Sequence, residues 1–177
     1  DQMGCSSPRL LVWVGDDENN SNQSDFFIRL ARLTQIKNYD SETATVIAKI
    51  ASSYATAIDA KNSLINTYGN NVTVVNTRDF PHIRGSFCGG GLFHVWKTDR
   101  LLNLSSYLNK KDQTLSVFGF SNEELQSFVG ITAGRGIDRI VDFGQALEFD
   151  RFWDGNDLLQ SFTKRVSLKA SFDLPGK

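Results

Sequence analysis

The chain has 177 residues, of which 40% are hydrophobic and 22% are charged, and its formal net charge at pH 7 is −1. A chain of this length can bury a core of its own, and this composition is that of an ordinary globular protein. The balanced charge lacks the basic excess of a nucleic-acid-binding protein, and no apolar run is long enough to span a membrane.

Short apolar runs alternate with segments of helical periodicity along the sequence. A buried strand is predicted over 10–14, then a helix over 25–36 with Ser24 as its N-cap, then a longer helix from 41 to about 68 that ends at Gly69. That longer helix places its apolar residues along one face. Further strands are predicted over 72–75, 92–96, 115–120, 137–141 and 166–168, and further helices over 123–129 and 157–163. This alternation predicts one α/β domain over 1–177, with three layers and a mostly parallel sheet covered by helices on both faces.

Cys5 is the candidate nucleophile of the chain. It lies in the run Gly4-Cys5-Ser6-Ser7-Pro8, among small residues and turn formers just before the first predicted strand. Such a loop can expose a thiol while its backbone N–H groups hold an oxyanion. Arg9, or a helix capped by Ser7, could lower the pKa of the thiol. The alternative is a cysteine that is simply buried as a small hydrophobic residue.

Two glycine-rich stretches are weaker candidates for a binding loop. Cys88 precedes the run Gly89-Gly90-Gly91, which could let a ligand approach the backbone, but a plain turn is the favoured interpretation. The segment 134–136, Gly-Arg-Gly, could face a phosphate, but a helix C-cap is favoured there.

The remaining polar candidates are isolated in the sequence. His82 and His94 could each pair with a cysteine, but they are twelve residues apart without a cysteine pair beside them, so no metal site is predicted. Glu148 could act as an acid or base, or lie on the surface. The segment 153–155, Trp-Asp-Gly, is interpreted as an architectural turn in which Asp154 caps backbone N–H groups.

Three stretches taken together resemble one enzyme family. They are Cys5-Ser6-Ser7-Pro8, then Gln113-Thr114-Leu115-Ser116, and then a distal block that runs from Gly136-Ile137-Asp138-Arg139-Ile140-Val141 through Gly144-Gln145-Ala146-Leu147 to Trp153-Asp154-Gly155. In this order they resemble the LuxC family of fatty acyl-CoA reductases, which supply aldehyde for bacterial bioluminescence. That family is a branch of the aldehyde dehydrogenase superfamily.

The resemblance implies a fold, a reaction and roles for individual residues. The fold would be that of the aldehyde dehydrogenase catalytic domain, and the reaction would be reduction of a long-chain fatty acyl-CoA to the aldehyde by NADPH or NADH. Cys5 would accept the acyl group, the backbone N–H groups of Cys5 and Ser6 would hold the oxyanion, and Phe87 would contact the nicotinamide ribose. Two departures are visible: Gln2 lies three residues before the cysteine, where the superfamily has a glutamine two before it, and no glutamate lies near Phe87.

The resemblance also implies a larger context for the chain. It would be the C-terminal, cysteine-bearing fragment of a homo-oligomeric enzyme, inactive alone because the main cofactor-binding domain lies upstream. Its partners would be a fatty acyl-CoA and acyl-transferring proteins, with no nucleic acid. Independently of the resemblance, two cysteines are too few for a disulfide scaffold and favour reduced thiols in the cytoplasm. Three alternatives stay open: an enzyme that oxidises aldehydes, a cysteine-dependent acyl carrier or hydrolase without redox chemistry, and a non-catalytic interaction module.

Overall fold

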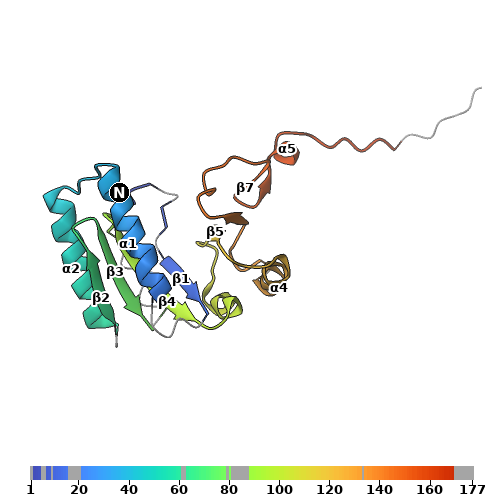
Figure 1. Cartoon of the computed structure of the whole chain (residues 1–177). Coiled ribbons are helices and arrows are strands. Elements are labelled where there is room, and N and C mark those ends of the chain that lie inside the picture. Colours follow the sequence, from blue (N-terminus) through green and yellow to red (C-terminus); the bar gives the residue numbers. More distant parts are fainter. Residues whose placement is uncertain are drawn as a thin grey trace, which may run out of the picture. The chain divides into compact units, whose positions relative to one another are not determined.

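The computed structural model describes residues 2–4, 7–8, 10–15, 21–60, 63–78, 80, 88–132 and 134–169. The chain divides into two compact units (Figure 1). Unit 1 comprises Asp1–Leu108 and Phe120–Ala133, and unit 2 comprises Asn109–Gly119 and Gly134–Lys177. The expectation that all 177 residues form one catalytic domain stays a prediction.

Unit 1 is built on a four-stranded sheet in the order β1-β4-β3-β2. Strands β1 (Leu10–Val14), β4 (Leu92–Thr98) and β3 (Val72–Thr77) run parallel, and β2 (Leu64–Tyr68) pairs with β3 in the antiparallel direction. The two central strands are rich in β-branched and aromatic residues and are buried along almost their whole length, as parallel strands covered on both faces must be. The predicted α/β class and mostly parallel sheet are therefore confirmed.

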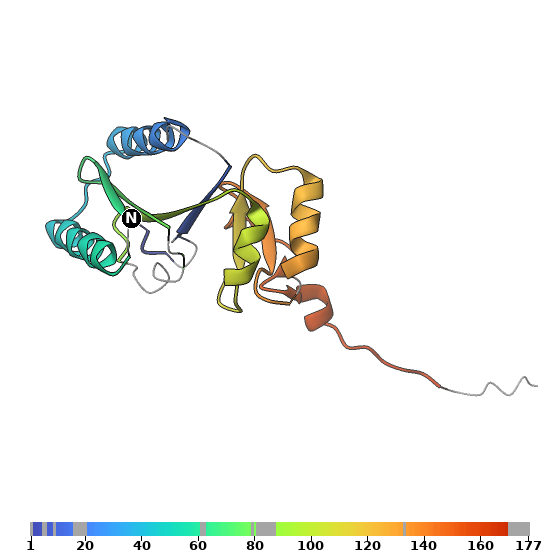
Figure 2. The same cartoon turned by 90° about the horizontal axis from the view of Figure 1, so that it is seen from below.

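Helices α1 (Ser21–Ile36) and α2 (Thr43–Asp59) lie on opposite faces of this sheet (Figure 2). Phe27 of α1 is fully buried against Val72 and Val74 of β3 and Phe93 and Val95 of β4, which together form the main core cluster. Successive side chains of a strand point to opposite faces. His94 therefore faces the other helix, and its Nε2 lies 3.4 Å from Oγ1 of Thr56 in α2.

The prediction of one long helix over 41–68 is wrong at its C-terminal end. Helix α2 ends at Asp59, and Leu64–Tyr68 form β2, which contains the strand-forming Ile65 and Thr67. Gly69 has a φ of +66° and lies in the turn that joins β2 to β3, so its left-handed backbone closes a hairpin instead of ending a helix. Ser24 is also not an N-cap, because α1 begins three residues earlier.

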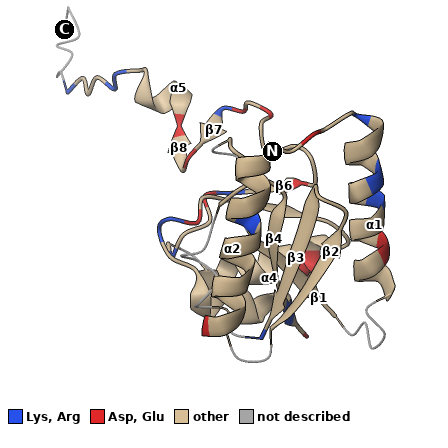
Figure 3. Ribbon diagram, turned by 90° about the vertical axis from the view of Figure 1, so that its left-hand side faces the viewer, with Lys and Arg blue, Asp and Glu red and all other residues tan. Residues whose placement is uncertain are grey.

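Helix α2 turns its polar stripe to the sheet and its apolar stripe outward. Its buried residues are Lys49, Ser53 and Thr56. The exposed residues of the outward stripe are Ile47, Ile50, Tyr54 and Ile58. In Figure 3 the ribbon of α2 is almost entirely uncharged.

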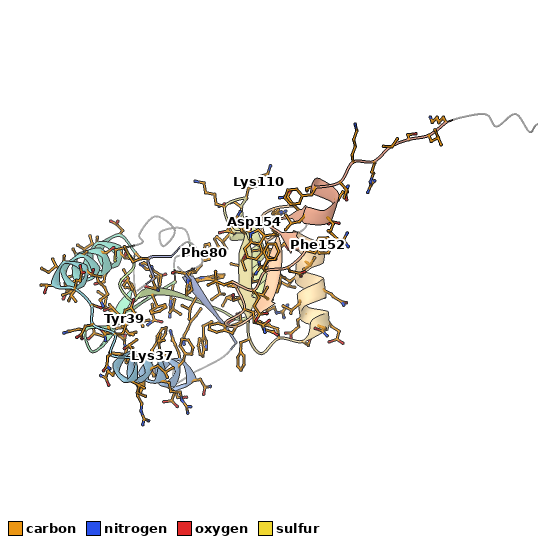
Figure 4. The ribbon with its side chains drawn as sticks, turned by 90° about the horizontal axis from the view of Figure 1, so that it is seen from above. Lys37, Tyr39, Phe80, Lys110, Phe152 and Asp154 are labelled. Atoms are coloured by element: carbon orange, nitrogen blue, oxygen red, sulfur yellow. The ribbon has the colours of Figure 1, made fainter. Side chains whose placement is uncertain are left out.

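The rest of unit 1 packs a short 3₁₀ helix against α4. The segment η1 (Leu101–Tyr107) was not predicted, whereas α4 (Asn122–Thr132) confirms the helix predicted over 123–129 and is longer at its C-terminal end. Phe80, labelled in Figure 4, forms an aromatic cluster with Trp96 and Tyr107, with ring centroids 4.4–5.3 Å apart.

Unit 2 contains two small pairs of strands. Strand β5 (Thr114–Val117) pairs in parallel with β6 (Arg139–Asp142), and β7 (Phe152–Trp153) forms a hairpin with β8 (Asn156–Asp157), followed by α5 (Leu158–Ser161). Asp157 caps α5 by accepting a hydrogen bond from the backbone N–H of Gln160. The strand predicted over 166–168 is wrong, because these residues are exposed and irregular.

Within the described ranges, no helix combines the length and the apolar content that crossing a bilayer requires.

Candidate functional site

The predicted site residues Cys5, Ser6 and Phe87 lie outside the described residues, as do Arg9 and His82. Their roles therefore stay predictions. The described residues that flank them in the sequence can be placed, and they meet at one edge of the sheet of unit 1.

Gln2 joins the two flanking segments. Its side-chain Oε1 accepts a hydrogen bond from the backbone N–H of Gly91 at 2.9 Å, and its Nε2 donates to the carbonyl of Pro8 at 3.1 Å. The backbone N–H of Ser7 donates to the carbonyl of Gly4 at 3.1 Å. The segment that contains Cys5 is thus tied to the glycine run that follows Phe87.

This meeting point lies at the amino ends of the parallel strands. Gly91 directly precedes β4, Pro8 lies two residues before β1, and the turn of residues 69–71 directly precedes β3. Ligands in open parallel sheets usually bind at the opposite, carboxyl edge. Sequence patterns typical of such sheets therefore could not have indicated this position.

The glycine run forms a tight turn. The N–H of Leu92 donates to the carbonyl of Gly89 at 3.2 Å, and the N–H of Thr73 in β3 donates to that of Gly91 at 2.9 Å. Gly91 has a φ of +81°, and a Cβ atom there would lie only 1.8 Å from the backbone oxygen of Asn71. These contacts support the interpretation of the run as a turn.

Lys49 holds the same turn from helix α2. Its side chain is 1% exposed, and its Nζ donates to the backbone carbonyls of Gly90, at 2.9 Å, and Asn70, at 2.5 Å. It therefore joins the turn before β4 to the turn before β3. Burial lowers the pKa of Lys49, and the nearby Cys88 opposes that shift. Sequence reasoning missed this residue, although it is the one charged residue between 43 and 58.

Cys88 and His94 have local partners in this region. Cys88 is a free, partly buried thiol whose Sγ lies 3.5 Å from the carbonyl oxygen of Gly89. His94 is buried beside Thr56. Neither of these two contacts joins the thiol to the imidazole.

The distal block that carries the family resemblance forms a compact local arrangement in unit 2. The guanidinium of Arg139 lies 4.3 Å from the ring centroid of Trp153, and its Nη2 donates to the carbonyl of Ala146 at 3.0 Å. A Cβ at Gly155 would lie 2.9 Å from Oδ1 of Asp138. The residues that resemble the family signature thus contact one another across some fifteen positions of sequence.

The other candidates of unit 2 and α4 have structural explanations. Asp154 and Gly155 have φ values of +48° and +74°, which form the two-residue turn between β7 and β8 (Figure 4 labels Asp154 and Phe152). Gly134, with a φ of +75°, follows the end of α4, as predicted for a C-cap. Glu148 is exposed.

Comparison with known protein families finds no family model that matches this chain, and no curated protein matches it.

The glycine run does not fit the pyrophosphate of a nicotinamide cofactor. Such a site needs free N–H groups, usually at the start of a helix. Here the N–H of Gly91 is bonded to Gln2, and the run leads into a strand. Among the described residues, His, Cys, Asp and Glu also do not gather in the groups of three that a metal ion would need.

Proposed function

We propose that this chain is the thiol-bearing catalytic part of an NAD(P)H-dependent fatty acyl-CoA reductase of the LuxC type. The sequence resemblance indicates the family. The hydrogen bond between Gln2 and Gly91 is the main structural observation that supports the proposed site. It joins the segment around Cys5 to the segment that follows Phe87, although 89 positions separate the two bonded residues. An enzyme that transfers hydride to an acyl-cysteine needs its nucleophile and its cofactor contact in one place.

The chain's own chemistry is the acylation of Cys5. The thiolate attacks the carbonyl carbon of the acyl-CoA, and a carbon–sulfur bond to Cys5 forms as the carbonyl oxygen becomes an oxyanion. The N–H groups of Cys5 and Ser6 hold this oxyanion. Collapse breaks the bond to the sulfur of coenzyme A, which leaves as a thiolate and takes up a proton. Removing one donor of this kind typically slows a reaction by about 10²- to 10³-fold.

The nicotinamide cofactor, when bound, supplies a hydride. The overall change is acyl-CoA plus NAD(P)H plus a proton to aldehyde, free coenzyme A and NAD(P)⁺. Phe87 is this chain's proposed contact to the cofactor. The glycine run does not provide the pyrophosphate site, so we assign that site to a separate domain of a larger, cytoplasmic homo-oligomeric enzyme.

A non-redox acyl carrier or hydrolase is the second candidate. The hydrogen bond from the N–H of Gly91 to Gln2 favours it, because that donor is not open to a cofactor phosphate and this candidate needs no cofactor site. It would accept an acyl group on Cys5 and pass it to a protein partner or to water.

Intact mass spectrometry tests the proposal. The chain and a Cys5→Ala variant are incubated with palmitoyl-CoA, with and without NADPH. We expect a mass increase of one acyl group in the unchanged chain alone. Absence of an adduct, or an equal adduct in both proteins, would contradict the proposal. Deacylation without NADPH that releases free fatty acid, or transfers the acyl group to a protein, would favour the second candidate.

A further inference from the structure

A short turn in unit 2 carries two exposed lysines, Lys110 and Lys111 (Figure 4 labels Lys110). The turn is fixed by side chains on either side of them. The carboxylate of Asp112 accepts a hydrogen bond from the backbone N–H of Asn109 at 2.9 Å, and Oδ1 of Asn109 accepts one from the N–H of Lys111, also at 2.9 Å. The backbone that carries the two lysines is therefore held in one conformation.

Gly136 brings an arginine from a distant part of the sequence to this turn. A Cβ atom at Gly136 would lie 2.3 Å from the backbone oxygen of Asn109 and 3.3 Å from that of Asp112. Because neighbouring Cα atoms are only about 3.8 Å apart, the exposed Arg135 lies beside the turn as well. The three cations, here called the basic cluster, are Lys110, Lys111 and Arg135.

The charges of the basic cluster are not neutralised by paired acids. Among the described residues, no carboxylate forms an ion pair with any of its three members. Two aspartates lie in the same segments. Asp112 accepts the bond from the turn backbone, and Oδ1 of Asp138 lies 2.9 Å from the position of a Cβ at Gly155. The cations therefore outnumber the nearby acids and are open to an anionic ligand.

An exposed aromatic ring lies in the same unit, on residues linked to the turn. The backbone N–H of Arg139 donates at 3.1 Å to the carbonyl of Gln113, which directly follows the turn. The guanidinium of Arg139 lies 4.3 Å from the ring centroid of Trp153, and the ring of Phe149 lies 5.5 Å from that of Trp153. Phe149 is 76% exposed, so its ring is open to a further stacked ring.

We propose that the basic cluster and Phe149 bind the phosphorylated adenosine part of coenzyme A. Lysine and arginine donate charge-assisted hydrogen bonds to phosphate oxygens, and a purine base stacks on an exposed aromatic ring. This inference rests on the proposed function, in which an acyl-CoA is the substrate. NADPH also carries a phosphorylated adenosine, but its pyrophosphate site is assigned above to a separate domain, which leaves coenzyme A as the ligand of unit 2.

Isothermal titration calorimetry of the whole chain tests this site without any acyl transfer. The ligands are free coenzyme A, pantetheine, which lacks the nucleotide, and NADPH. One variant combines Lys110→Gln, Lys111→Gln and Arg135→Gln, and a second is Phe149→Ala. The matched control combines Lys164→Gln, Arg165→Gln and Lys169→Gln, which remove the same charge from exposed positions after α5.

We expect the chain to bind coenzyme A more tightly than pantetheine or NADPH. The affinity for coenzyme A should fall at least about 10-fold in the triple variant of the basic cluster, because charge-assisted bonds to phosphate are lost. It should fall about fivefold or more in Phe149→Ala, because a stacked base loses its platform. The control should change it less than about twofold, and higher salt should weaken binding by the unchanged chain.

Three results would overturn the inference. They are no binding of coenzyme A, equal binding of pantetheine or NADPH, and an equal loss of affinity in the control and in the triple variant of the basic cluster. A failure of the proposed function is distinguishable from these results. A chain that binds coenzyme A through the basic cluster but takes up no acyl group from palmitoyl-CoA would contradict the reductase and not this site.

Discussion

Lys49 is a charged side chain buried in a helix whose other residues up to position 58 are uncharged. A buried ammonium is costly unless its N–H groups are bonded, and here two of them bind backbone carbonyls in two separate turns. The bond to Gly90 is buried, and the bond to Asn70 is partly buried. These two hydrogen bonds offset the free-energy cost of burying the charge, and they also fix the turns that precede β3 and β4.

A Lys49→Met variant tests this interpretation. Methionine replaces much of the apolar stem but leaves the carbonyls of Asn70 and Gly90 without their donor. We expect the free energy of unfolding to fall by about 1–3 kcal/mol, measured by urea denaturation. The exposed Lys110→Met is the control and should change it by less than about 0.5 kcal/mol. Equal effects of the two substitutions would contradict a buried, hydrogen-bonded role.

A pair of glycine substitutions tests the packing of the glycine turn. Gly91 and Gly69 both have positive φ values, but a Cβ at Gly91 meets the oxygen of Asn71, whereas a Cβ at Gly69 meets nothing within 4 Å. We expect Gly69→Ala to cost about 1 kcal/mol from backbone strain alone. Gly91→Ala should cost clearly more, because the clash is with backbone. Thermal or urea unfolding of both variants checks this, and equal costs would rule out the close approach.

Helix α2 shows what periodicity can and cannot predict about an element. The spacing of Ile47, Ile50, Tyr54 and Ile58 correctly indicates that they share a face, but the structure exposes that face. Periodicity does not determine which face meets the sheet. Here the opposite face carries Lys49 and Thr56, whose hydrogen bonds reach the turns and His94.

The exposed stripe predicts an unusual mutational response. Replacing Ile47 and Ile58, which are 62% and 83% exposed, by glutamine should leave the free energy of unfolding within about 0.5 kcal/mol per site. Phe27→Ala, in the core on the other face, should cost about 3–5 kcal/mol. Urea denaturation of both proteins is the measurement. A large loss from the isoleucine substitutions would show that this face is covered in the folded chain.

The segment β7–β8–α5 carries an ion pair between Arg151 and Asp157, and this pair should make the stability of the segment depend on pH. Hydrogen bonds from Arg151 to Asp157 lower the pKa of that carboxyl. Because the folded-state pKa lies below the unfolded one, the pair stabilises the segment above the unfolded pKa. That contribution is lost as the pH falls through the lowered folded pKa. Arg151 is exposed and Asp157 is partly exposed, so the effect should be small and should weaken with salt.

Carbon-detected NMR titration of the Asp157 carboxyl checks this prediction. In Arg151→Gln the pKa of Asp157 should rise toward its ordinary value. An unchanged pKa would mean that the N-cap hydrogen bond from Gln160, and not Arg151, determines it.

At the scale of the whole molecule, local sequence predicted most elements but not their long-range partners. The α/β class, three strands of the main sheet and both of its helices follow from apolar runs and periodicity. The hairpin strand β2 was missed because Ile65 and Leu64 continue the apolar spacing of the preceding helix. The segment η1 was missed because a short 3₁₀ helix has little periodicity to detect.

The residues of the candidate site also fall into two groups, those predicted from the sequence and those found only in the structure. Cys5, Ser6 and Phe87 were chosen from local residues and a family resemblance, and they stay predictions. Gln2 and Lys49 emerge only from the structure, since their hydrogen bonds span 89 and 41 positions. A local sequence pattern cannot predict hydrogen bonds between residues so far apart in the sequence. Two sequence regions that the resemblance assigns to one active site are nevertheless joined by one of these bonds.

The location of the acyl group tests the central claim most directly. After reaction with palmitoyl-CoA, tryptic cleavage at Arg9, Arg84 and Lys97 places the two cysteines on different peptides, 1–9 for Cys5 and 85–97 for Cys88. Tandem mass spectrometry under conditions that preserve thioesters then locates the acyl group. We predict that it is found on Cys5. An acyl group on Cys88, or on neither cysteine, would contradict the assignment of Cys5 as the residue that accepts the substrate.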